Sequence, residues 1–311
     1  MTLNAAVIPE PDLLHWNIAN VDRCRLAHLP PGDIRALVRS NEELPPMPAL
    51  AKQLWALRDD DNASAQSLAE TIQLDPLLAS QILRRANSAY HGGVRTIDSV
   101  QDAVTRLGFN TSLDFALALA ALSPLRTPNQ GPIGRDRLWQ HGLRCSLVMQ
   151  ELAKQQRGAI QLPLGLVQLS GITHNIGYFL LGHLLPEQFH FLSRLIASNP
   201  GLSLPTIDRF ALGVEHTQLG EWLYDAWEMP APLLLAVRHH HNPAYKGDHE
   251  QLVLLTGLAD SLLEQSGLGL GGCHPTEDHD RFLARLGLDP TACSDVIEHA
   301  LAETPLGPRA P

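Results

Sequence analysis

Histidines are the residues of this chain whose type and spacing could do chemistry. The sequence has 15 histidines in 311 residues, against only 23 lysines and arginines. Many of them cluster in the second half, at His174, His183, His190, His216, His239, His240, His241 and His249. Because imidazole is the commonest protein ligand of transition metals, this cluster favours metal chemistry.

One earlier histidine shares a helical stripe with apolar residues. The stripe recurs every three or four positions and consists of Leu138, His141, Cys145, Val148 and Leu152. This spacing directs His141 toward the core. A plainer interpretation stays open for His141 and for His216, namely a buried histidine that only forms hydrogen bonds. For the triplet 239–241, the plainer interpretation is a cationic cap at a helix C-terminus.

The elements that must position these histidines are predicted to be helices. Apolar residues recur with helical spacing from Met47 to Gln265, and no stretch of five or more residues alternates with β-branched side chains. Helix starts are expected at the caps Ser64, Asp75 with Pro76, and Asp98, and Leu113–Leu122 is apolar on nearly every face. Later helices are expected over 164–184, 187–198, 205–226, 231–241 and 249–265. The predicted fold class is all-α, a multi-helix bundle of two packed lobes.

A segment rich in proline and glycine, Pro124–Gly134, separates the two lobes. The expected organisation is an N-terminal leader over 1–38 with a short helix at Asp33–Arg39, a first lobe over 39–122, a second lobe over 136–245, and a helical extension with a tail over 246–311 that completes the second lobe. The run GLGLGG at Gly267–Gly272 lacks the preceding strand and the lysine of a phosphate loop, so it is interpreted as a linker.

Composition excludes several classes of protein. With 44% hydrophobic residues the chain is globular, and its net charge of -10 opposes direct binding to nucleic acid. The longest apolar run, Phe115–Leu122, is too short for a membrane span, and Met1–Asn20 has no lysine or arginine to begin a secretory signal. The cysteines, Cys24, Cys145, Cys273 and Cys293, are widely spaced. These features favour a reduced, cytoplasmic protein without a membrane association.

A family resemblance becomes specific at SGITHNIGYFLLGH, Ser170–His183. There His174-Asn175-Ile176-Gly177 resembles a degenerate His-Asp-Ile-Gly motif of the HD superfamily of metal-dependent phosphohydrolases. Further segments resemble, in order, landmarks of the HDOD domain: ELPPMPALAKQLWAL, LDPLLASQILRRANSAYHG, IDSVQDAVTRLG, EHTQLGEWLYDAWEMP and HHNP. The resemblance covers roughly 39–245, and the HDOD family is related to, but distinct from, the HD-GYP cyclic-di-GMP phosphodiesterases.

The resemblance implies a vestigial metal site. Its residues would be His141, His174, Asn175, His216, His240, His241 and Asp260. Asparagine replaces the aspartate that would bridge two metals, and a neutral amide cannot bridge them as a carboxylate does. Tyr178 stands where active enzymes of this type carry a lysine. We therefore expect no binuclear hydrolase site, although one divalent transition metal such as Zn, Ni or Fe is compatible with the imidazoles.

The function that the resemblance implies is a non-catalytic bacterial signal-transduction module that acts through a protein partner. The expected binding surfaces are the first lobe around Asn87-Ser88 and the cleft between the lobes. One alternative is a residual metal-dependent phosphohydrolase or cyclic-di-GMP phosphodiesterase. Another is a small-ligand sensor that uses the histidine pocket. Self-association into a homo-oligomer is a further alternative.

Overall fold

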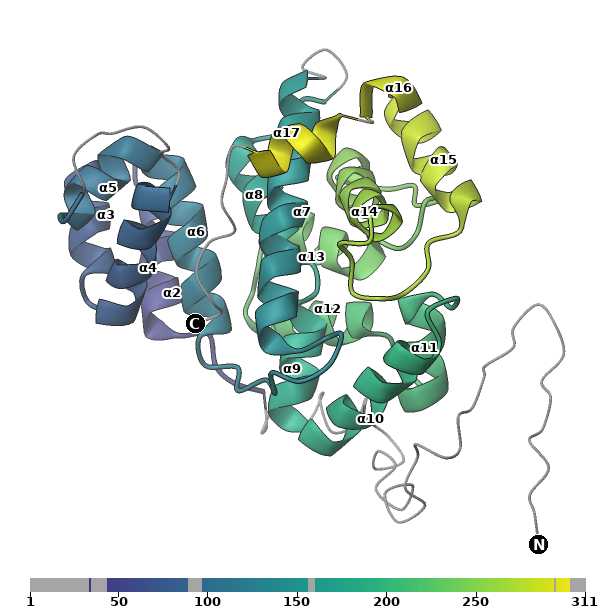
Figure 1. The fold of residues 1–311 in the computed structure, drawn as a ribbon. Helices are drawn as coiled ribbons and strands as arrows, with labels where there is room; N and C mark the ends of the chain where they lie inside the picture. The colour runs from purple at the N-terminus through teal and green to yellow at the C-terminus, as the bar shows by residue number, and fades with distance from the viewer. Residues whose placement is uncertain (1–33, 35–43, 89–96, 156–159, 294, 303–311) are drawn as a thin grey trace, which may run out of the picture.

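The fold is helical throughout the part of the chain that the structure describes. This computed structural model describes residue 34 and residues 44–88, 97–155, 160–293 and 295–302, and no strand occurs in these ranges. The predicted helix at Asp33–Arg39 lies outside the described residues, apart from Ile34. The all-α prediction is confirmed, and Figure 1 shows two lobes placed side by side.

The first lobe contains five helices among the described residues: α2 (Ala49–Arg58), α3 (Ala65–Ile72), α4 (Pro76–Ser88), α5 (Val100–Leu107) and α6 (Phe109–Leu122). The predicted starts of α3 and α4 are confirmed. Ser64 and Ser67 form a reciprocal capping box, and the Asp75 carboxylate accepts the backbone N–H groups of Leu77 and Leu78. The predicted cap Asp98 is wrong by one residue, because the Ser99 hydroxyl accepts the free N–H of the first turn.

Helix α6 joins the two lobes. Every side chain from Ser112 to Leu122 is buried, as expected for a helix that is apolar on nearly all faces. The helix packs against α2 in its own lobe and against α8 in the other, and the ring of Phe115 lies 5.8 Å from that of Trp139. A second link is the indole N–H of Trp227, which donates to the carbonyl of Pro45.

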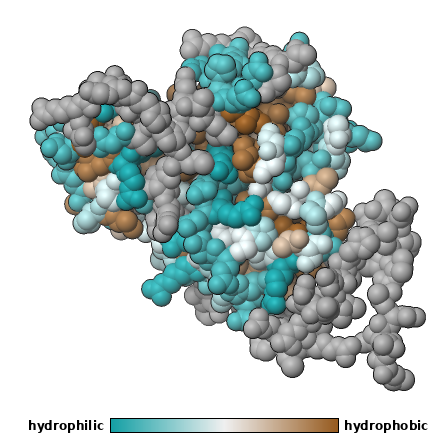
Figure 2. Space-filling view, in the orientation of Figure 1, coloured by the Kyte–Doolittle hydropathy of each residue, from teal (hydrophilic) through white to brown (hydrophobic). Residues whose placement is uncertain are grey.

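The second lobe is larger and carries the histidines. Its helices are α7 (Arg135–Gln155), α8 (Leu164–Thr173), α9 (Ile176–Leu184), α10 (Pro186–Ser198), α11 (Leu204–Leu212), α12 (His216–Ala226), α13 (Ala231–His239), α14 (Glu250–Gln265), α15 (Thr276–Leu286), α16 (Pro290–Cys293) and α17 (Val296–Ala302). The last four pack with α7 around a second apolar core. On the face in Figure 2, hydrophobic residues gather beside α14 and α17. No described helix is long and apolar enough to cross a membrane.

Two long helices of the sequence prediction are wrong. The helix expected over 164–184 breaks at His174 and Asn175, and the helix expected over 205–226 breaks at Gly213, which adopts a left-handed conformation. Both breaks are invisible to periodicity because the apolar residues continue across them. Each break places polar side chains at a helix end in the interior, where the site forms.

The Gly-rich segment is also more than a linker. Leu270 is 1% exposed, and the Glu264 carboxylate accepts the backbone N–H groups of Leu270 and Gly271. The Arg137 guanidinium donates to the carbonyl of Gly269. These contacts hold the segment against the second lobe and fix the start of the chain that follows it.

Candidate metal centre in the second lobe

The seven residues that the resemblance singles out lie together in one buried cluster. They come from α7 (His141), the break between α8 and α9 (His174 and Asn175), the start of α12 (His216), the end of α13 (His240 and His241) and α14 (Asp260). Neighbouring imidazole rings are 4.2 to 5.5 Å apart, from His141 through His174, His240 and His216 to His241. All are buried except His241, which is half-buried.

Close helix packing brings these residues together at two glycines. A side chain at Gly177 would overlap the carbonyl oxygen of His216, and one at Gly257 would overlap the carbonyl of His240. Helix α9 therefore lies directly against α12, and α14 against the end of α13. The glycine of the Asn-Ile-Gly motif is a packing requirement of the site.

Asp260 is the hub of the cluster. One carboxylate oxygen lies 2.9 Å from His141 Nε2 and 3.8 Å from His174 Nε2, and the other lies 2.9 Å from His274 Nε2. Burial alone raises the pKa of Asp260, but the hydrogen bonds from His141 and His274 outweigh burial and lower that pKa well below its ordinary value. Burial alone likewise lowers the pKa of His274, yet its hydrogen bond to Asp260 raises it overall. Asp260 is thus a buried carboxylate anion.

Asn175 caps the imidazole of His174. The ring nitrogen Nδ1 of His174 lies 2.9 Å from the carbonyl of Gly171 and must donate to it. The opposite nitrogen, Nε2, therefore carries a lone pair when the ring is neutral, and the Asn175 amide donates to it at 2.7 Å. The amide oxygen of Asn175 is buried without a partner. An aspartate here would leave a second carboxylate in the cluster, whereas asparagine supplies a donor.

A buried aspartate orients His216. Asp208 accepts the backbone N–H of His216 at 3.0 Å and lies 2.5 Å from its Nδ1. The Tyr178 hydroxyl also donates to Asp208, and the Tyr178 ring stacks on His216 at 4.2 Å. Burial, together with Asp208, raises the pKa of Tyr178 well above its ordinary value, so it remains a neutral donor. His216 Nε2 then faces the cluster. In metal sites, a carboxylate that accepts the other ring N–H of a histidine orients the ring in the same way.

His240 and His241 complete the inner face. His240 Nδ1 donates to the carbonyl of Val237 at 2.9 Å, and its Nε2 is buried without a partner. His241 Nε2 lies 3.2 Å from His216 Nε2. Burial lowers the pKa of both His240 and His241 well below the ordinary value, so both rings are neutral. An orphaned, neutral imidazole nitrogen is the form that a metal ion binds.

The comparisons with known proteins identify the family of this fold. The HDOD domain family model matches residues 44–243. The chain belongs to the HDOD family. A solved structure from Marinobacter aquaeolei VT8, provisionally named a signal transduction protein, is 32% identical to this HDOD chain, with a TM-score of 0.74. The match covers 85% of this chain and 58% of the Marinobacter chain.

Two other solved structures share the HDOD fold. An HDOD domain protein of unknown function from Geobacter sulfurreducens is 21% identical with a TM-score of 0.66, over 88% of this chain and 90% of that one. A provisionally named metal-dependent phosphohydrolase from Shewanella amazonensis SB2B is 18% identical with a TM-score of 0.60, over 86% of this chain and 94% of the Shewanella chain. An uncharacterized Treponema pallidum protein is 21% identical over 220 residues. The HDOD chain spans 42% of the Treponema protein and 58% of the Marinobacter protein.

The donor set fits one transition-metal ion better than two hard ions. Three donor groups in the described chain have ligand atoms within 4.8 Å of one another: His141 with Cys145, His174 and Asp260; His216 with His240 and His241; and His241 with Asp260 and His274. Imidazole and thiol donors suit Zn, Ni or Fe, whereas Mg and Mn favour carboxylate oxygens. Asp260 is the only carboxylate in these groups, and a binuclear site for hard ions does not fit.

Sequence reasoning missed three residues of this HDOD site. One of them, Cys145, was placed on the buried stripe but was not assigned to the site. Asp208 lies eight positions before His216, beyond the helix break at Gly213, and no periodic signal links them. His274 follows the Gly-rich segment and lies outside the family match. A histidine and a cysteine together in GGCHP are a sequence signal for a ligand, but the contact of His274 with Asp260 depends on how the segment packs.

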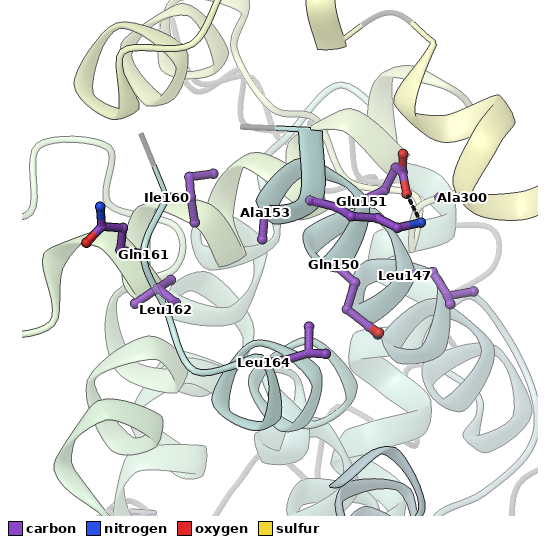
Figure 3. A pocket seen from close by; sticks show the side chains of 10 residues that line it. Leu147, Gln150, Glu151, Ala153, Ile160, Gln161, Leu162, Leu164 and Ala300 are labelled. Atoms are coloured by element: carbon purple, nitrogen blue, oxygen red, sulfur yellow. Dashed lines mark hydrogen bonds and ion pairs between the residues drawn. The ribbon is translucent and has the colours of Figure 1, made fainter. Parts of the chain in front are cut away.

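The cluster opens to the surface through a small pocket. Its volume is about 180 Å³, and His241, Cys273, His274 and Arg209 are among the residues that line it. A larger pocket of about 520 Å³ lies elsewhere, between the end of α7, residues 160–164 and Ala300 of α17, with the Glu151–Lys154 ion pair at its edge (Figure 3). The larger pocket contains none of the site residues.

We expect His141→Ala to lower the free energy of unfolding by about 1–3 kcal/mol even without metal, because it leaves a cavity and removes a hydrogen bond from Asp260. Urea denaturation in the presence of a chelator measures this loss. His190→Ala, at a partly exposed histidine of α10, is the matched control. An unchanged midpoint for His141→Ala would contradict its buried position.

We also expect the metal-free protein to lose stability as the pH falls from 7.5 to 5.5. Burial lowers the pKa of His174, His240 and His241, so the unfolded chain binds more protons than the folded one below the ordinary histidine pKa of about 6.5. His274, whose pKa is raised, acts in the opposite sense but is a single group. A urea midpoint that stays constant or rises over this interval would contradict the prediction.

Proposed function

We propose that this HDOD chain is a non-catalytic signal-transduction module that acts through a protein partner and holds at most one metal ion. The observation that carries the proposal is Asn175, whose amide donates to the His174 nitrogen that a metal would bind. Without a carboxylate at this position, Asp260 is the only carboxylate in these donor groups, which is too few to hold two adjacent dications in a buried site.

The surroundings of the cluster also oppose phosphoester hydrolysis. Tyr178 stands where a lysine would contact phosphate, and its hydroxyl is engaged with Asp208 in the interior. The pocket that leads to the cluster has a volume of about 180 Å³, whereas small-molecule sites usually measure about 300 Å³ or more. A cyclic dinucleotide is too large for this opening.

We expect no turnover of cyclic-di-GMP or of a generic phosphodiester with Mn, Mg, Fe or Ni. Metal-assisted hydrolysis needs an activated water and charge stabilisation at phosphorus, and Asn175 and Tyr178 occupy the positions whose carboxylate and lysine would supply them. The assay uses the purified full chain, with His174→Ala as the control for contaminating enzymes. Activity that copurifies with the protein and disappears in His174→Ala would replace the signalling proposal with an enzyme.

The first lobe offers an exposed apolar surface for the partner. Leu74 and Leu77 are 68% and 50% exposed at the corner between α3 and α4. Asn87, in contrast, is a structural residue, because its side chain exchanges two hydrogen bonds with the backbone of Ile97 and donates to Leu83. The side chain of Ser88 lies outside the described residues.

The partner proposal is tested by capture from a bacterial lysate with the full chain as bait. The double variant Leu74→Glu with Leu77→Glu should lose a captured protein that the wild type retains, because buried charge is costly at an interface. Leu164→Glu is the matched control, since Leu164 is also 50% exposed but lies on the second lobe. Equal capture by all three proteins would remove this surface from the proposal.

A further inference from the structure

A sulfur atom lies inside the histidine cluster. Cys145 follows His141 by one turn of α7 and is fully buried. Ligand atoms of His141, Cys145, His174 and Asp260 all lie within 4.8 Å of one another. We propose that these four residues form a closed, four-coordinate Zn²⁺ site in which the Cys145 thiolate is a ligand.

Charge balance favours this group over the other histidines. A dication in a buried site needs compensating negative charge, and neutral imidazoles supply none. The group of His216, His240 and His241 contains no anion. The Asp260 carboxylate and the Cys145 thiolate together carry two negative charges, which neutralise Zn²⁺. Cys145 thus replaces the charge that Asn175 no longer supplies.

The chemistry of the donors selects the ion and the role. A thiolate is a soft ligand that favours zinc and disfavours Mg and Mn. Two nitrogens, one sulfur and one oxygen complete the tetrahedral shell that zinc adopts in structural sites, and no position remains for a water. The ion would hold α7, the α8–α9 break and α14 together, and it would not activate a nucleophile.

Zinc binding requires specific proton movements. The Cys145 thiol proton is released to solvent, and the thiolate forms the new bond to zinc. The Nε2 proton of neutral His141, now shared with Asp260, moves to Nδ1, which has no partner in the structure. The Asn175 amide leaves His174 Nε2, and this lone pair turns to the ion. No oxidant or reductant is needed.

The inference rests on the single-ion part of the proposed function, and cobalt spectroscopy separates the two. Chelator-treated full-length protein is titrated with Co²⁺ alone under reducing conditions, and its absorption spectrum is recorded. We expect one equivalent to produce a thiolate-to-cobalt charge-transfer band together with the visible bands of tetrahedral cobalt. Cys145→Ala should abolish the charge-transfer band and weaken Zn²⁺ binding about 100-fold.

The controls do not depend on how well the Cys145 variant folds. A triple variant, Cys24→Ala with Cys273→Ala and Cys293→Ala, leaves Cys145 as the only thiol and should retain the band. Loss of the band in this triple variant would overturn the inference, because another cysteine would be the ligand. Cobalt bound without the band would place the ion among histidines and overturn the inference alone. No cobalt binding would overturn the inference and leave the proposed function, which allows at most one ion, intact. Two bound equivalents of cobalt would overturn both.

Discussion

Replacing Asp260 by alanine is expected to lower the free energy of unfolding by about 3–5 kcal/mol at neutral pH. The carboxylate accepts hydrogen bonds from His141 and His274 and is 2% exposed. Removing one partner from a buried charged network leaves the others desolvated and unpaired. The measurement is urea denaturation of chelator-treated protein, so that the loss reflects the network alone.

The pH dependence of this stabilisation follows from the direction of the shift. The pKa of Asp260 is lowered in the folded state, so its contribution is present above the ordinary aspartate pKa of about 3.9 and disappears only as the pH falls through the folded pKa. The full effect is therefore expected at pH 7.

Two variants calibrate the Asp260 result. Asp260→Asn keeps the shape and one acceptor oxygen, so its loss should be smaller than that of Asp260→Ala. Asp225→Ala, at an exposed aspartate of α12, should change the free energy of unfolding by less than about 0.5 kcal/mol. A loss below about 1 kcal/mol for Asp260→Ala would show that Asp260 is not the hub of the cluster.

Gly177→Ala should destabilise the protein by about 3 kcal/mol, although it adds only one methyl group. The new Cβ would overlap the carbonyl oxygen of His216 and approach the backbone nitrogen of Gly220 to 2.9 Å. Both are backbone atoms and cannot rotate away, so α9 must separate from α12. Because His216 begins α12, the same shift would displace its imidazole from the cluster.

The matched control is Gly201→Ala. A Cβ at Gly201 meets no atom within 4 Å, so its denaturation midpoint should stay close to that of the wild type. Thermal and urea denaturation of both variants measure the difference. If Gly177→Ala were as stable as Gly201→Ala, the close contact between α9 and α12 would be wrong.

The sequence by itself determined the class of fold and much of the site. Helical periodicity and local caps such as Ser64 depend on neighbours within one or two turns, so they can be predicted without a structure. The stripe that contains His141 and Cys145 predicted their buried position, and the structure places both in the core. The ordered motifs identified the family, which the family match over 44–243 confirms.

Only the tertiary structure decided which atoms of the site contact one another. The helix break at His174 and Asn175 lies within an unbroken apolar pattern, and it sets which nitrogen of His174 faces Asn175. Asp208 and His274 reach their partners through a turn and a packed Gly-rich segment. Their roles depend on atoms brought together from distant parts of the chain. Periodicity reports which face of a helix is buried, but the partner on that face is set by how the helices pack.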